Sequence, residues 1–210
     1  MGQFFHYLTL SSFIGGVGIA LEIAVLALIF GLPLALLVAL ARNSRLGPLR
    51  WVTVAFIWVM RGTPLLLQLI FWYNLLPQAG LRLSAFSTAV FGLAVNEGAF
   101  SAEIIRGGLL AVKRSQLDAA ASLGMPPGLT LRRVQVPQAL RVIVPAMGNE
   151  VIILIKNTSL ASVIAVSELT LRSEQAVSTT FRYVPVFTAA AVLYLCLLYT
   201  SDAADDLTRV

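Results

Sequence analysis

The residues best suited to chemistry in this sequence are polar side chains that interrupt long apolar stretches. Lys156 opens a run of one cation and three hydrogen-bonding side chains, Glu97 and Glu103 add carboxylates, and Arg61 adds a second cation. A carboxylate ligand needs Arg or Lys, whereas an ammonium ligand needs a carboxylate or a carbonyl oxygen. The pattern therefore predicts a path for a small zwitterion, lined by Arg61, Thr63, Glu97, Glu103, Lys156, Asn157 and Ser159.

A second interpretation of these charges is structural, and the sequence leaves both open. An ionisable residue at the centre of a membrane helix costs roughly 2.5–3.5 kcal/mol, so Arg61, Glu97 and Lys156 should face each other or a hydrated path. Glu103 and Arg106 stand at i, i+3 and can pair on one helix face. An internal network of ion pairs and hydrogen bonds would then fix helix packing without touching any solute.

Metal and nucleophilic chemistry have no support in the residue counts. The chain has one histidine, His6, and one cysteine, Cys196. These exclude an intrachain disulfide, a structural zinc cluster and an imidazole pair. We therefore expect no catalytic residue, no metal and no cofactor.

The composition indicates an integral membrane protein. Of 210 residues, 58% are hydrophobic and 12% are charged, whereas soluble domains have about 45–50% apolar and about 25% charged residues. Gly31, Ala35 and Ala39 recur at i, i+4 and i+8, a spacing that lets another helix approach closely. The predicted fold is all-α, with about five transmembrane helices at residues 17–41, 51–76, 84–112, 142–166 and 184–199. One structural interpretation of the segment Arg61–Pro64 is that Pro64, which lacks a backbone donor, breaks and tilts the second of these helices.

Basic residues predict how the helices are oriented, because Lys and Arg concentrate in cytoplasmic connections. The first connection holds three arginines and no acid, and the third holds five basic residues against Asp118. The N-terminus is therefore predicted outside and the C-terminus inside. This topology explains the net charge of +5 without a nucleic-acid partner.

The connection between the third and fourth stretches has a structure of its own. It is rich in alanine from Gln116 onwards, which favours a helix, and Gly124 with Pro126 supplies a stop. A second short helix is expected from Thr130, ending before Pro137. Small side chains on the first helix would permit close docking into a groove of a partner.

Motifs in this connection resemble the EAA loop of ABC importer permeases. Asp118-Ala119-Ala120, Gly124 and Val134-x-Val136-Pro137 follow the spacing of that loop, although Asp118 replaces the usual glutamate and Ser115 stands where glycine is common. Further segments resemble permease subunits of polar amino acid importers, namely Arg61-Gly62-Thr63-Pro64 with Gln68, residues 102–108, Pro137-Gln138-Ala139 with Arg141, and residues 156–160 with Glu168-Leu169.

The resemblance implies a type I importer permease in a bacterial inner membrane, multi-pass and surrounded by lipid. Its implied partners are an ABC ATPase subunit pair, a second permease subunit and an extracytoplasmic solute-binding protein. The sequence has no phosphate-binding loop, so ATP hydrolysis would belong to another chain. The transmembrane domain is expected to span 1–200, with a cytoplasmic coupling loop at about 113–137 and an acidic tail, expected to be foreign, at 201–210. The residues implied to contact the ATPase are Gln116, Asp118, Ala119, Ala120, Gly124 and Pro137.

Three alternatives to this function stay open at the level of sequence. A permease of the same fold could serve another small solute, such as an osmolyte or a sulfur compound. An ion-coupled secondary transporter could use Glu97 and Lys156, although the paired repeats common in such folds are not evident. A membrane scaffold with no transport role is the third.

Overall fold

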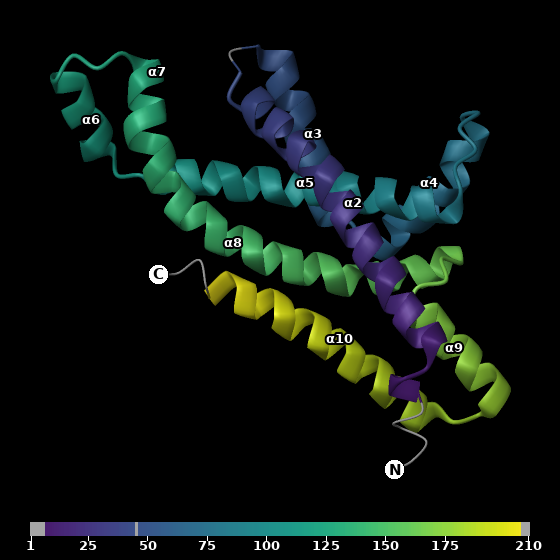
Figure 1. Ribbon diagram of the computed structural model, residues 1–210. Coiled ribbons are helices and arrows are strands. Elements are labelled where there is room, and N and C mark those ends of the chain that lie inside the picture. The colour runs from purple at the N-terminus through teal and green to yellow at the C-terminus, as the bar shows by residue number, and fades with distance from the viewer. Residues whose placement is uncertain (1–6, 45, 207–210) are drawn as a thin grey trace.

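In the computed structural model, which describes residues 7–44 and 46–206, these residues form helices and no strand. The all-helical fold class is thus confirmed. In chain order the elements are α2 (Ser11–Arg42), α3 (Gly47–Gly62), α4 (Leu65–Gln78), α5 (Ala85–Ala111), α6 (Arg114–Ser122), α7 (Pro127–Thr130), the π-helical turn η1 (Leu131–Gln135), α8 (Val136–Asn157), the 3-10 helix η2 (Thr158–Ile164), α9 (Leu169–Thr180) and α10 (Tyr183–Asp206) (Figure 1).

Two helical segments of the described chain are long and apolar enough to cross a membrane, namely α2 and the continuous helix Pro127–Ile164. The pair α3 and α4 meets the same criteria when taken as one bent span, and α10 holds a shorter apolar helix over Tyr183–Tyr199. Each of the five predicted stretches falls on helix. The number of crossings, the orientation and the foreign origin of the tail stay predictions, and residues 207–210 lie outside the described part of the chain.

The predicted break in the second apolar stretch is confirmed. α3 ends at Gly62, Thr63 and Pro64 adopt extended angles, and α4 starts at Leu65. The two helices meet at 112°. The cause is local, because the proline ring removes a backbone donor and would clash with the preceding turn of a continuous helix.

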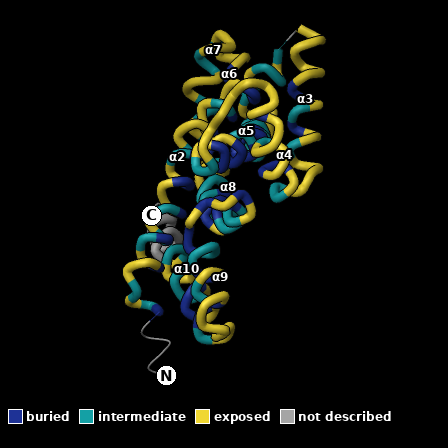
Figure 2. The backbone as a smooth tube through the Cα atoms, turned by 90° about the vertical axis from the view of Figure 1, so that its right-hand side faces the viewer, coloured by how far each residue is buried: buried dark blue, intermediate teal, exposed yellow. Residues whose placement is uncertain are grey.

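Helices α2 and α5 cross at the centre of the molecule, and buried residues concentrate on them (Figure 2). The small-residue stripe of Gly31, Ala35 and Ala39 is buried, as its spacing predicted. A Cβ at Gly31 would lie 3.0 Å from the Ala94 carbonyl oxygen and 3.1 Å from Glu97 Cβ. The stripe therefore lets the backbones of α2 and α5 approach closely, which places polar groups of α5 against α2.

The prediction for the long connection is half right. Its alanine-rich part forms α6, and Gly124 stops this helix with a φ of +73°. The expected end before Pro137 is wrong, since helix runs from Pro127 through η1 into α8. Val136 keeps helical angles (φ −61°, ψ −48°) although a proline follows it. Pro137 lies in the first turn of α8, where its missing N–H is tolerated.

Glu168 holds the outer helices α9 and α10 together from a fully buried position. Its carboxylate caps α9 by accepting from the backbone N–H groups of Thr170 (2.8 Å) and Leu171 (3.0 Å). It also accepts from the Tyr194 hydroxyl on α10 at 2.8 Å. Burial raises the pKa of the Glu168 carboxyl, and the hydrogen bonds it accepts oppose that rise.

Substitution of Gly16 by alanine is expected to destabilise the contact between α2 and α9. The added Cβ would lie 2.8 Å from Leu169 Cα and 2.9 Å from Leu169 N, and these backbone atoms cannot rotate away. We expect a loss of about 1–3 kcal/mol in stability, measured by thermal unfolding in detergent. Gly18→Ala is the matched control, because no atom lies within 4 Å of its Cβ position. This control should be neutral or stabilising through helix propensity, and an equal loss in both variants would contradict the packing argument.

Candidate functional site

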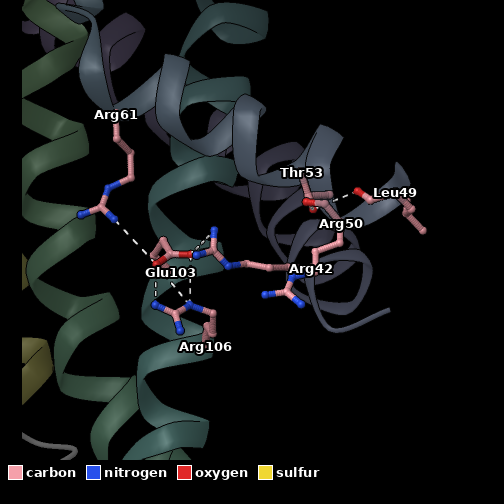
Figure 3. Close-up of polar contacts among 7 residues, drawn as sticks. All are labelled: Arg42, Leu49, Arg50, Thr53, Arg61, Glu103 and Arg106. Carbon is pink, nitrogen blue, oxygen red and sulfur yellow. Dashed lines mark hydrogen bonds and ion pairs between the residues drawn. The ribbon is translucent and has the colours of Figure 1, made fainter. Parts of the chain in front are cut away.

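The carboxylate of Glu103 on α5 lies among three guanidinium groups (Figure 3). Arg106, one turn along α5, donates from Nε to both oxygens at 3.2 Å and from Nη2 to Oε2 at 3.0 Å. Arg42, which ends α2, places Nη1 3.2 Å from Oε1, and Arg61 of α3 places Nη1 3.9 Å from Oε2. The predicted pairing of Glu103 with Arg106 is confirmed. We call this set the Glu103 cluster: Arg42, Arg61, Glu103 and Arg106.

The Glu103 cluster ties three helices together and carries an excess of positive charge. Its carboxylate is the most buried member, with a side chain 15% exposed, and Arg61 is the least buried at 45%. At 3.9 Å, Arg61 is beyond hydrogen-bond range of the carboxylate. The Arg61 guanidinium also lies over the ring of Phe100 on α5, 5.1 Å from the ring centroid, which is a cation–π contact. Arg61 is therefore the most loosely held of the cations.

Glu97, the second predicted carboxylate, does not join this cluster. It is 2% exposed and accepts a hydrogen bond of 2.5 Å from Ser101 Oγ, one turn along the same helix. Glu150 of α8 is also buried and lies close enough to interact electrostatically with Glu97. The interior between α2, α5 and α8 thus holds two carboxylates, of which only Glu97 was predicted to line the path.

The predicted run at Lys156 marks the change from α8 to η2. The Thr158 hydroxyl donates to the Ile155 carbonyl oxygen and the Ser159 hydroxyl to the Lys156 carbonyl oxygen, both at 2.7 Å. These hydroxyls therefore satisfy backbone groups where the helix tightens. Asn157 is half-buried, and the Lys156 side chain is exposed with no ion pair among the described residues. Arg61, Glu97 and Lys156 do not meet, contrary to one of the arrangements expected for them.

A network around Gln68 went unassigned in the sequence prediction of the site. The Gln68 side chain is buried and donates from Nε2 to the Met60 carbonyl oxygen (2.8 Å), the Thr63 carbonyl oxygen (3.1 Å) and Thr63 Oγ1 (2.9 Å). Its Oε1 accepts from Asn96 Nδ2 at 3.0 Å. The network satisfies carbonyl groups freed by the break between α3 and α4. Amides within apolar stretches were the available signal, and Thr63 belongs to this network.

The predicted coupling residues share one projection formed by α6 and α7, beyond the ends of α5 and α8 (Figure 1). On α6, Ala120 is buried, while its neighbours in the motif are exposed, as is Leu123 at 82%. Gly124 closes the projection with its left-handed turn, and Pro137 lies at its base. The exposed motif residues are Gln116, Asp118, Ala119, Gly124 and Pro137.

The sequence and fold have close counterparts among known proteins. The family model described as "Binding-protein-dependent transport system inner membrane component" matches residues 31–207. The L-cystine transport system permease protein TcyB of Bacillus subtilis (strain 168) is 44% identical over 161 residues, covering 77% of this chain and 69% of TcyB. The glutamine transport system permease protein GlnP of Escherichia coli (strain K12) is 40% identical over 186 residues, covering 88% of this chain and 85% of GlnP.

A solved structure extends the likeness to the whole fold. "Crystal structure of an amino acid ABC transporter with histidines" describes a chain that superposes with a TM-score of 0.89 at 38% identity, covering 94% of this chain and 92% of that one. The residues matched by the family model, 31–207, include the bent pair α3–α4, the Glu103 cluster and the α6–α7 projection. The chain belongs to the family of binding-protein-dependent transport system inner membrane components, and it is a permease component of a transport system and not an enzyme.

Proposed function

We propose that this chain is the permease subunit of an ATP-driven importer of polar amino acids in a bacterial plasma membrane. The observation that carries the proposal is the exposed α6 helix, which stands beyond the long helices with small side chains on its surface. Such a helix can dock closely into a groove of a separate ATPase subunit. Because the sequence has no phosphate-binding loop, ATP binding and hydrolysis must occur on that partner.

The mechanism we propose is alternating access driven from the cytosol. Closure of an ATPase pair around ATP moves α6, and the helices joined to it reopen the permease outward. The proposed topology has five crossings within residues 1–200, the N-terminus outside, the C-terminus inside and the coupling loop 113–137 in the cytosol. A second permease subunit would complete the path, and an extracytoplasmic solute-binding protein would deliver the solute.

The substrate class rests on the relatives and on the polar groups available. TcyB and GlnP carry the names of cystine and glutamine transport, and both solutes are zwitterions. We propose that Lys156, exposed and without an ion pair among the described residues, binds the substrate carboxylate beside Asn157 and Ser159, and that Glu97 provides negative charge deeper in the path. Glu103 is already engaged by arginines, so Arg61, Thr63 and Glu103 are proposed to shape the path by fixing the helices around it.

The test is reconstitution of the permease with its ATPase and receptor in proteoliposomes, with uptake of labelled cystine and glutamine as the readout. ATP-dependent uptake is expected, and Lys156→Gln should raise KM about tenfold with little change in kcat, as loss of one charge-assisted hydrogen bond predicts. Arg182→Gln, an exposed charge outside the path, is the control. Uptake driven by an ion gradient without the ATPase would overturn the proposal in favour of a secondary transporter. Labelling of the 113–137 loop from outside would overturn the topology.

A further inference from the structure

The Glu103 cluster holds more positive charge than its own carboxylate can neutralise. Three guanidinium groups converge on one carboxylate. Arg106 occupies both oxygens with its hydrogen bonds, and Arg42 approaches Oε1. Arg61 remains outside hydrogen-bond range of Glu103, although it also interacts electrostatically with the Glu150 carboxylate of α8. Charges of one sign at such close quarters repel each other, so an additional anion would stabilise the arrangement.

A space suited to that anion lies beside Arg61. A cavity of about 410 Å³ is lined by Ile57, Trp58, Arg61 and Gly62 of α3. The guanidinium contributes donors, and the other lining groups are largely apolar. An occupant would therefore carry an anionic group next to hydrocarbon, which is the composition of a phospholipid at the depth of its headgroup.

The break after Gly62 places Arg61 at the end of α3 and not at the centre of a continuous span, and the exposed tryptophans of this helix agree with a membrane interface. Trp51 and Trp58 stand 75% and 82% exposed on this helix, and tryptophan is enriched where headgroups meet hydrocarbon. The helix α3 follows the basic first connection, and Arg42 of the cluster ends the preceding helix α2. Basic pockets between membrane helices on the cytoplasmic side bind anionic headgroups.

We propose that the Glu103 cluster is a phosphate site, in which Arg61 binds the phosphodiester of an anionic phospholipid of the inner leaflet and the positive charges of Arg42 and Arg106 attract it. Guanidinium groups match phosphate oxygens in geometry and form charge-assisted hydrogen bonds with them. The Glu103 carboxylate competes with the phosphate for the same guanidinium donors. The lipid would bridge α2, α3 and α5, whatever solute the permease carries.

The experiment compares retention of phosphatidylglycerol and phosphatidylcholine by the purified full-length chain, measured by native mass spectrometry after exchange into mixed micelles. The wild-type chain should prefer phosphatidylglycerol, and Arg61→Gln should weaken its retention about tenfold. Arg141→Gln removes an exposed charge elsewhere, at the start of α8, and should retain the lipid as the wild type does. Equal losses in both arginine variants would overturn a defined site in favour of a diffuse surface charge.

Glu103→Gln is expected to change the retention of phosphatidylglycerol in the opposite direction to Arg61→Gln. Removing the competing carboxylate leaves the arginines free for phosphate, so retention of phosphatidylglycerol should rise. A damaged fold would lower the retention of phosphatidylglycerol, and a fall in this variant would overturn the proposal.

Inorganic phosphate and glycerol 3-phosphate form the second arm of the test. If neither compound displaces the lipid at millimolar concentration, the result supports a phospholipid as the occupant. Full displacement by either compound would overturn the lipid proposal and indicate a site for soluble phosphate. Displacement by free glutamine would overturn the phosphate assignment itself.

Discussion

Replacing Gly124 with valine is expected to abolish ATP-driven uptake while the membrane helices stay folded. Gly124 turns the chain between α6 and α7 with a φ of +73°, which costs a β-branched residue about 1–3 kcal/mol. No atom lies within 4 Å of its Cβ position, so the side chain itself creates no clash. The strain is relieved by moving α6, and a misplaced α6 cannot transmit the motion of an ATPase. Uptake in proteoliposomes should fall at least about tenfold.

Gly128→Val is the matched control for this prediction. Gly128 lies in α7 of the same projection, also has open space at its Cβ position, and has no positive φ. Its variant should retain most uptake, since only helix propensity is altered. Thermal unfolding and ATPase activity, measured on both variants, separate uncoupling from misfolding. Normal uptake by the Gly124 variant, with hydrolysis still coupled to transport, would contradict the role of α6.

Features that depend on neighbours in sequence were predictable. Pro64 predicted the break between α3 and α4, because a missing donor acts on its own turn. Gly124 predicted the end of α6 for an equally local reason. The pairing of Glu103 with Arg106 followed from the pitch of a helix. In each case the physical cause lies within a few residues, so no knowledge of the packed structure was needed.

Features that depend on packing were not predictable from the same patterns. Arg42 served in the sequence only as a topological charge, yet α2 carries it to Glu103 of α5. Gln68 and Asn96 are 28 residues apart, and the packing of α4 against α5 brings their amides together. At Pro137 the local rule favoured a helix end, but the π-helical turn before it changes the backbone hydrogen-bond pattern, so the helix continues despite the missing N–H of the proline.

Replacing Gln68 with leucine is expected to give the largest loss of stability among single substitutions in the bent pair. Its amide donates to the Met60 carbonyl, the Thr63 carbonyl and the Thr63 hydroxyl, and accepts from Asn96. Leucine satisfies none of these groups, and each one that water does not reach costs about 1–3 kcal/mol when left unsatisfied. The Met60 carbonyl then keeps only the longer hydrogen bond from Asn96 Nδ2 (3.3 Å) and the Thr63 carbonyl loses its side-chain donor, so the break itself becomes less favourable. We expect a loss of several kcal/mol, seen as a Tm lowered by about 5–10 °C.

Gln78→Leu tests whether the loss belongs to the network or to the substitution alone. Gln78 ends the same helix and is exposed, so its variant should unfold at the wild-type Tm. Asn96→Ala should destabilise the chain less than Gln68→Leu, because the amide of Gln68 still serves the carbonyl groups at the break. When Asn96→Ala is combined with Gln68→Leu, it should cause little further loss of stability, since both substitutions act through one network. Full additivity of the two substitutions would show that Gln68 and Asn96 act separately, and an unchanged Tm in Gln68→Leu would show that the bend needs no support from this amide.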